Sequence, residues 1–315
     1  MDTHLTTSPD EAARFVRRGQ LVAFPTETVY GLGADALQAE AVRAIFEAKG
    51  RPADNPLIVH LVERAQLRQV VAVVPAVAEA LLDRFAPGPL TLILPKAERL
   101  PSVVTAGLDT VGVRFPAHEG ARAFLRACDT PVAAPSANRS GRPSPTHWTA
   151  VQEDLGGRIA CILTGGRTQA GVESTVLDCT SAPPTVLRPG AVSVEQLRAA
   201  IGTVDVGDAS GSDTTRSPGT KHRHYAPAAQ VRLVRGSDEA EAGPTAAYIG
   251  LDAPVRAQTF GQCRVLGDVE AYARELFHFF RACDRAGCTV IYAQVVAAEG
   301  LGRALNDRLE RAAAR

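Results

Sequence analysis

Short apolar runs alternate along the chain with longer stretches in which apolar positions recur every three or four residues. The short runs predict strands at residues 21–24, 57–62, 90–94, 111–115, 132–134, 159–163, 175–178 and 185–187. The longer stretches predict helices, among them residues 39–49, 76–85 and 194–201. A further helix is predicted to begin at Ser8 and Pro9, with Glu11 completing the N-terminal signal, and to end at Gly19. This alternation is typical of a mixed α/β layer structure.

A segment rich in Gly, Ser, Asp and Thr divides the chain at residues 202–217 and predicts a flexible linker. The pattern beyond it predicts strands at 231–234, 246–249 and 289–292 and helices at 269–286 and 302–314. These elements indicate a small second α/β domain of parallel character. A length of 315 residues also favours two domains. We place the domains at 1–202 and 231–315, with a linker or lid at 203–230.

The composition excludes several classes of protein. Lys+Arg and Asp+Glu both number 34, so no overall field recruits nucleic acid or an anionic membrane. The six cysteines contain no CxxC pair, which argues against zinc-ribbon and thioredoxin sites. The first ten residues lack the features of a signal peptide, and no uncharged apolar run approaches the roughly 18 residues of a membrane span. We therefore expect a cytoplasmic protein with no membrane association and no stable nucleic-acid binding.

The most unusual segment, PTETVYGLG at residues 25–33, directly follows a predicted strand. Loops at strand ends are where α/β proteins place ligand groups. Residues 31–36 fit a GxGxxA dinucleotide fingerprint, but six residues separate the strand from the first glycine, whereas the fingerprint needs a tight turn there. A turn whose glycines accept positive φ is the better interpretation.

Two cations, Lys49 and Arg51, flank Gly50 after a predicted helix. They form a compact anion clamp or, alternatively, an ordinary helix end whose cations complement the dipole. His60 alternates with apolar neighbours, a pattern that is more often that of a hydrogen-bonded core histidine than of a catalytic one. Arg114 lies within an apolar strand and requires a carboxylate partner, either a structural Asp or Glu or a substrate carboxylate.

Polar residues also follow other predicted strands. The loop at 134–141 is rich in Ser and Asn, which suits hydrogen bonds to phosphate or ribose but also suits a simple turn. Ser174 and Arg188 lie at further strand ends. Taken together, the cations, the hydroxyls and His60 indicate an anion-binding α/β enzyme without a P-loop or an acid dyad. The residues alone leave its reaction open.

Seven segments occur in the order seen in the YrdC-like family: PTETVYGLG, KGRPADNPL, the strand with His60, VGVRFP, APSANRSG, ESTVLD and LRPG. Residues 217–227, SPGTKHRHYAP, also resemble the linker of the long, two-domain members, which are threonylcarbamoyl-AMP synthases. The resemblance covers residues 8–227 and implies a twisted mixed sheet with helices, then a linker and a small Rossmann-like α/β domain. Thr220 and His222 depart from the family's linker pattern, which implies the loss of an apolar or aromatic lid contact.

The resemblance implies the substrates ATP, L-threonine and bicarbonate or CO₂, and the products threonylcarbamoyl-adenylate and pyrophosphate. The adenylate would pass to proteins that form threonylcarbamoyladenosine in tRNA. The implied threonine-binding residues are Thr28, His60, Arg114, Ala134 and Ser174. The implied ATP-binding residues are Lys49, Arg51, Asn55, Thr110, Ser136, Asn138, Ser144, Arg188 and Tyr225. Lys49 and Arg51 would carry the catalysis, with Mg²⁺ on the phosphates and no metal site in the protein itself.

Two alternatives belong to other functional classes. The same basic cavity would seat RNA in a binding module without turnover, although zero net charge and 5% aromatic residues count against it. A carbamoyl-transferring maturation factor for hydrogenases contains a related module, but the acylphosphatase segment and zinc-binding CxxC pairs of such factors are missing.

Overall fold

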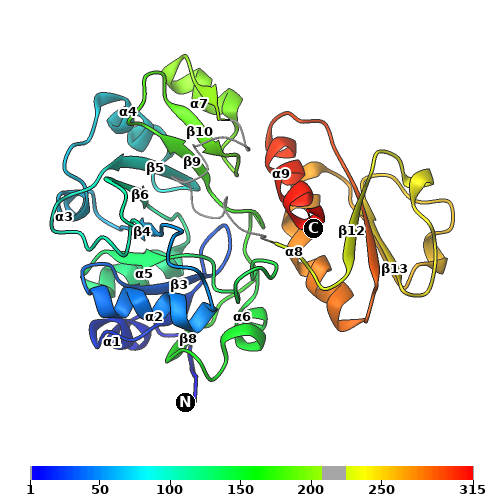
Figure 1. The fold of residues 1–315 in the computed structure, drawn as a ribbon, viewed down its shortest axis with the longest axis horizontal. Helices are drawn as coiled ribbons and strands as arrows, with labels where there is room; N and C mark the ends of the chain where they lie inside the picture. The colour runs from blue at the N-terminus through cyan, green and yellow to red at the C-terminus, as the bar shows by residue number, and fades with distance from the viewer. Residues whose placement is uncertain (1, 208–224, 315) are drawn as a thin grey trace.

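Two sheets organise the computed structural model, which describes residues 2–207 and 225–314 (Figure 1). Within these residues the larger sheet has the strand order β1-β8-β2-β3-β7-β4-β6-β5-β9-β10-β11, and the smaller sheet has the order β12-β15-β13-β14. The larger sheet mixes parallel and antiparallel pairs. All pairs in the smaller sheet are parallel. Both results confirm the predicted classes.

The strands of the larger sheet are β1 (His4–Thr6), β2 (Val22–Phe24), β3 (Gly31–Asp35), β4 (Ile58–His60), β5 (Leu90–Pro95), β6 (Thr110–Arg114), β7 (Val132–Ala134), β8 (Cys161–Leu163), β9 (Thr175–Asp178), β10 (Thr185–Arg188) and β11 (Asp205–Val206). Its helices are α1 (Pro9–Arg17), α2 (Ala39–Lys49), α3 (Leu67–Val70), α4 (Ala76–Phe85), α5 (Glu119–Cys128), α6 (Trp148–Leu155) and α7 (Val194–Ile201). The smaller unit contains β12 (Gln230–Val234), β13 (Ala246–Gly250), β14 (Gln262–Val265), β15 (Val290–Gln294), α8 (Val269–Arg285) and α9 (Leu301–Ala313).

Local sequence signals correctly predicted where several helices begin and end. The predicted helices at 39–49, 76–85 and 194–201 match α2, α4 and α7 at both ends. Helix α1 begins as expected, because the Ser8 side chain accepts a hydrogen bond from the backbone N–H of Glu11. Strands β1, β3, β11 and β14 and helices α3, α5 and α6 were not predicted.

The prediction of a turn with positive φ at Gly31 and Gly33 was wrong. Both glycines lie in strand β3, which pairs antiparallel with β2 and β7, and neither has a positive φ. A Cβ at Gly33 would lie 2.8 Å from Val132 Cγ1 and 3.0 Å from the Phe24 ring. Glycine is therefore needed so that neighbouring side chains can pack closely against this strand. The dinucleotide fingerprint also fails, because Gly31 and Gly33 lie within a strand and not in a turn between a strand and a helix.

The cores lie where the amphipathic elements meet the sheets. On the larger sheet, residues such as Ile45 and Leu81 bring α2 and α4 into one extended cluster. Val16 and Phe124 bring α1 and α5 into a second cluster. In the smaller unit, Phe277 and its neighbours on α8 pack against the parallel strands. Each unit therefore has an apolar cluster, and Val29 of the larger unit packs into the cluster of the smaller one.

The chain between the two units was predicted as a linker at 203–230. Strand β11 lies inside this range and pairs in parallel with β10, so the larger sheet extends through Val206. Residues 208–224, including Thr220 and His222, lie outside the described residues. Strand β12 then begins at Gln230. The division into domains otherwise stays a prediction.

Helices α8 and α9 lie on the side of the smaller sheet that faces the larger unit (Figure 1). The buried Arg281 of α8 donates through Nη2 to Asp154 Oδ2 of α6 at 2.7 Å and to the Pro143 carbonyl at 2.5 Å. A Cβ at Gly171 would lie 2.3 Å from the Arg274 Cα of α8, so the backbones of the two units approach closely. Buried charge pairs and close packing thus join the units.

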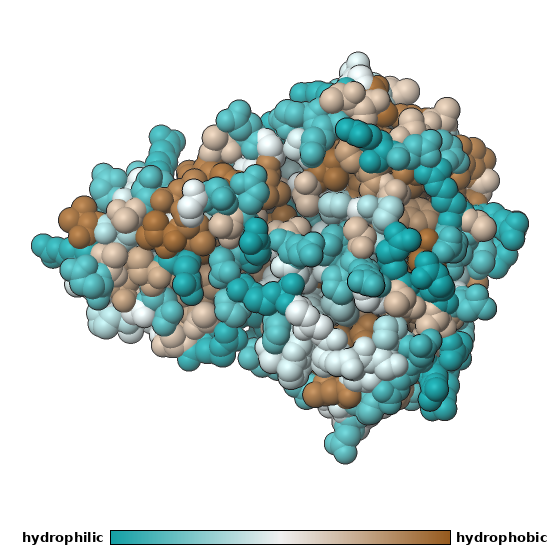
Figure 2. Space-filling view, turned by 180° about the vertical axis from the view of Figure 1, so that it is seen from behind, coloured by the Kyte–Doolittle hydropathy of each residue, from teal (hydrophilic) through white to brown (hydrophobic). Residues whose placement is uncertain are grey.

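Hydrophilic residues cover much of the face in Figure 2, with hydrophobic residues in separate patches between them. Among the described residues, no helix combines the length and the apolar character that crossing a membrane requires.

Candidate active site

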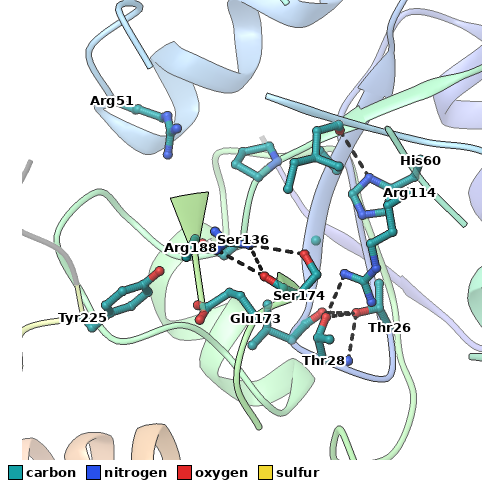
Figure 3. Close-up of a pocket in the computed structure, with 15 residues that line it drawn as sticks. Thr26, Thr28, Arg51, His60, Arg114, Ser136, Glu173, Ser174, Arg188 and Tyr225 are labelled. Atoms are coloured by element: carbon teal, nitrogen blue, oxygen red, sulfur yellow. Dashed lines mark hydrogen bonds between the residues drawn. The ribbon is translucent and has the colours of Figure 1, made fainter. Parts of the chain in front are cut away.

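The strand ends of the larger sheet converge on a pocket (Figure 3). Register explains this convergence, since His60 pairs with Arg114 between β4 and β6, and Ile58 pairs with Ala134 between β4 and β7. Nine of the predicted site residues line the pocket: Thr28, Arg51, His60, Arg114, Ala134, Ser136, Ser174, Arg188 and Tyr225. Segments distant in the sequence therefore meet at one place.

Arg114 has the carboxylate partner that its burial requires. Its Nη2 lies 2.7 Å from Glu27 Oε1, and its Nη1 donates to Thr28 Oγ1 at 2.9 Å. Burial raises the pKa of Glu27, but the charge of Arg114, its hydrogen bond and backbone hydrogen bonds together outweigh burial and lower the pKa. Within the described residues, Arg114 Nη2 makes no aligned hydrogen bond. The guanidinium is thus held in place by Glu27 and keeps a donor for a further carboxylate.

His60 is a buried, hydrogen-bonded histidine that also lines the pocket. Its Nδ1 lies 3.2 Å from the Ile58 carbonyl oxygen, and its ring meets Phe24 edge-on at 5.8 Å. Burial, followed by the Arg114 charge, lowers the pKa of His60 to about 3. The imidazole is therefore neutral at physiological pH.

This pKa predicts acid sensitivity of folding. Because the folded pKa of His60 lies below the unfolded value, the unfolded state binds more protons between about pH 3 and 6.5. The stabilising contribution of neutral His60 is present above pH 6.5 and is lost as the pH falls, by about 2 kcal/mol at pH 5. We expect His60→Gln to reduce the difference in urea unfolding free energy between pH 7.5 and pH 5 by this amount. The same change at the exposed His4 is the control, and equal slopes for His60→Gln and the wild type would contradict the assignment.

Two buried guanidinium groups lie on the opposite side of the pocket from Arg114 (Figure 3). Arg51 Nη2 donates to the carbonyls of Asn55 and Pro56, both at 3.4 Å, and burial lowers the pKa of Arg51 to about 10. Arg188 donates through Nη2 to the Ser174 carbonyl at 2.8 Å and to Ser174 Oγ at 3.2 Å. Burial also lowers the pKa of Arg188. Two buried cations near each other favour an anionic ligand between them.

Lys49 lies beneath the 134–141 loop rather than on the pocket wall. As the last residue of α2, it donates through Nζ to the Ser136 carbonyl at 2.5 Å and to the Asn138 carbonyl. Burial and then the Arg51 charge hold the pKa of Lys49 well below its ordinary value. Lys49 therefore ties the helix end to the loop, and its role toward phosphates stays a prediction.

Among the other predicted residues that do not line the pocket, Asn138 and Asn55 lie beside segments that form it, and Thr110 lies far from it. Asn138 Nδ2 donates to the Arg139 and Arg142 carbonyls, both at 2.8 Å, and fixes the loop. Asn55 is buried beside Arg51. Thr110 begins β6, whereas Arg114 ends it, so about 13 Å of strand separates them. The structure does not bring Thr110 to the pocket.

Three acidic or hydroxyl residues that the sequence interpretation omitted belong to the site. Glu27 pairs with Arg114, and Thr26 Oγ1 lies 2.8 Å from Thr28 Oγ1. Glu173 lines the pocket and accepts a hydrogen bond from Ser144 at 2.6 Å. The demand of a buried arginine for a carboxylate was the signal for Glu27, but the sequence did not indicate which acid would meet it.

The site contains one guanidinium beside hydroxyls and a neutral imidazole, and two further guanidinium groups across the cavity. This arrangement defines an α/β enzyme that binds a ligand with two anionic ends. A family model described as "Telomere recombination", that of the Sua5/YciO/YrdC proteins, matches residues 14–190. A second model, "Threonylcarbamoyl-AMP synthase, C-terminal domain", matches residues 192–314. The chain belongs to the Sua5/YciO/YrdC family and has its two-domain form.

Relatives with both domains are similar over nearly the whole chain. A threonylcarbamoyl-AMP synthase of Pyrococcus abyssi is 49% identical, covering 96% of this chain and 92% of the relative. One of Bacillus subtilis is 43% identical with the same coverage. The crystal structure of P. abyssi Sua5 complexed with L-threonine has a TM-score of 0.91 and 46% identity, covering 99% of this chain and 97% of that one. The predicted fold and family are thereby confirmed.

Proposed function

We propose that this chain joins L-threonine, bicarbonate or CO₂, and ATP into L-threonylcarbamoyladenylate and pyrophosphate. The observation that carries the proposal is the division of the pocket, with Arg114 at one end and Arg51 and Arg188 at the other. A carboxylate at the first end and a polyphosphate at the second match these charges. The names of the relatives and the threonine complex of P. abyssi Sua5 support the same reaction.

The reaction needs positioning more than a covalent nucleophile. Arg114 would hold the threonine carboxylate, with Thr28 and Ser174 beside it, so that the amine stays free. Bicarbonate takes up a proton and loses water to give CO₂. The neutral amine nitrogen then bonds to the carbon of CO₂ and passes one proton to water, which gives a carbamate. A carbamate oxygen then bonds to the α-phosphorus as the bond to the β-phosphate oxygen breaks, and pyrophosphate leaves. Arg51 and Arg188 would neutralise the charge that builds on the phosphates.

Mg²⁺ would enter with ATP as part of the substrate. Across residues 2–207 and 225–314, no three His, Cys, Asp or Glu side chains come together as a metal site. The protein's own contribution is therefore the guanidinium groups, together with the loop that Lys49 supports. Tyr225 lines the pocket and would cover the nucleotide.

The product is a mixed anhydride that water hydrolyses, so its use requires a downstream transfer protein. We assign that step to proteins that place the threonylcarbamoyl group on tRNA adenosine.

All six cysteines are free thiols, which supports a reducing, cytoplasmic location.

The test is pyrophosphate release by the purified full-length protein with MgATP, threonine and bicarbonate. We expect release to require all three substrates, and mass spectrometry to detect the adenylate. Each single omission serves as a control. The proposal fails if the complete mixture gives no more pyrophosphate than the mixture without threonine, while a relative assayed in parallel is active.

A further inference from the structure

Glu173 places a negative charge on the side of the pocket proposed for the phosphates. It is buried and lines the pocket together with Arg188 and Tyr225 (Figure 3). An uncompensated carboxylate there would repel a triphosphate and would be costly to bury. The site therefore requires a compensating charge at Glu173.

That charge comes from the C-terminal unit. Arg308 of α9 is completely buried, and its Nε donates to Glu173 Oε2 at 2.7 Å. Its Nη2 donates to the Pro189 carbonyl at 3.0 Å, and its guanidinium carbon lies 5.3 Å from the centre of the Tyr225 ring. These contacts place Arg308 directly behind the pocket wall, although it does not itself line the pocket.

The second carboxylate oxygen is also engaged, since Ser144 Oγ donates to Glu173 Oε1 at 2.6 Å. Burial raises the pKa of Glu173, but the charges of Arg308 and Arg188 and the hydrogen bonds from Ser144 and Arg308 together outweigh burial and lower the pKa. Glu173 is therefore ionised and held from both sides. Its orientation depends on one residue of the larger unit and one of the smaller.

We propose that Arg308 is a positioning residue for the reaction: it neutralises and orients Glu173 so that the phosphate side of the pocket accepts ATP. It acts through Glu173, and its guanidinium also lies over the Tyr225 ring. This inference rests on the proposed function, because it concerns the ATP end of the same site. It gives the C-terminal unit a specific part in nucleotide binding.

Docking of the two units does not depend on Arg308 alone. Arg281 and Asp154 form a separate buried pair, and Arg167 pairs with Glu275 at 2.9 Å on the surface. Arg167 lines no part of the pocket, so it provides a matched control across the same interface. A residue that only docks the units would affect both substrates alike, whereas Arg308 should affect ATP selectively.

The experiment compares full-length Arg308→Gln, Glu173→Gln/Arg308→Gln and Arg167→Gln with the wild type. ATP and threonine binding are measured separately by calorimetry, together with the KM for each substrate and the melting temperature. We expect Arg308→Gln to weaken ATP binding about tenfold or more, because it removes the largest positive charge acting on the buried Glu173 carboxylate, and to change threonine affinity less than about threefold. The double variant, which removes both charges, should recover most of the ATP affinity. Arg167→Gln should bind both substrates as the wild type does.

The double variant keeps the test decisive if Arg308→Gln alone does not fold, because it leaves no carboxylate unpaired at position 173. Near-wild-type ATP binding by the double variant supports the proposal. A double variant that folds but still binds ATP tenfold more weakly overturns it, as does an equal loss of ATP and threonine binding in Arg308→Gln. Absence of ATP binding by the wild type would instead refute the proposed function.

Discussion

Replacing Arg114 by alanine is expected to weaken threonine binding about 100-fold, because a charge-assisted hydrogen bond to the threonine carboxylate contributes up to about 3 kcal/mol. ATP affinity should change by less than about threefold, since the phosphate-side guanidinium groups stay in place. Calorimetric titration of each substrate separately measures the two effects. An ATP loss larger than the threonine loss would reassign Arg114 to the nucleotide.

The same substitution leaves Glu27 buried beside no cation. Breaking such a pair costs about 3–5 kcal/mol of unfolding free energy, so Arg114→Ala should also melt at a lower temperature. The variant Glu27→Gln/Arg114→Ala separates the two consequences. It should regain stability, because no charge is stranded, while threonine binding stays weak. Recovery of threonine binding in this variant would show that Arg114 acts only through the fold.

The sequence pattern predicted those features that depend only on residues close together in the chain. The ends of α2 and α4 follow from apolar periodicity, and the need of Arg114 for a carboxylate follows from the cost of burying a guanidinium. Strand β3 was missed because its glycines carry no strand signal. Their purpose is visible only once Phe24 and Val132 are seen packed against them.

The missing parts of the site depend on distant pairings. Glu27 and Arg114 are brought together by the order of the strands, which the periodicity of a single strand does not specify. Arg308 lies 135 residues from Glu173 in the sequence, in a chain whose basic residues are nearly all arginines. Nothing in its surroundings in the sequence distinguishes it from the surface arginines. Only the docking of α9 on the larger unit reveals it.

Gly190 is the position where the smallest substitution should have the widest effect. A Cβ there would lie 2.2 Å from the Thr175 nitrogen, 2.3 Å from the Ser174 carbonyl carbon and 2.6 Å from the Glu173 carbonyl oxygen. All three contacts are to backbone atoms, which no side-chain rotation can relieve. Gly190 is not among the glycines with positive φ, so the close approach itself requires glycine.

We therefore expect Gly190→Ala to displace the segment that carries both Ser174 and Glu173. Overpacking of this kind costs about 3 kcal/mol, and both ATP and threonine binding should fall about tenfold or more. Gly166→Ala is the matched control, because a Cβ there meets no atom within 4 Å. Thermal melting and separate titrations of the two substrates check both variants. If Gly190→Ala weakens the binding of only one substrate, the two ends of the segment can shift independently. If it weakens the binding of both, unlike the selective loss of threonine binding in Arg114→Ala, one backbone segment supports both halves of the pocket.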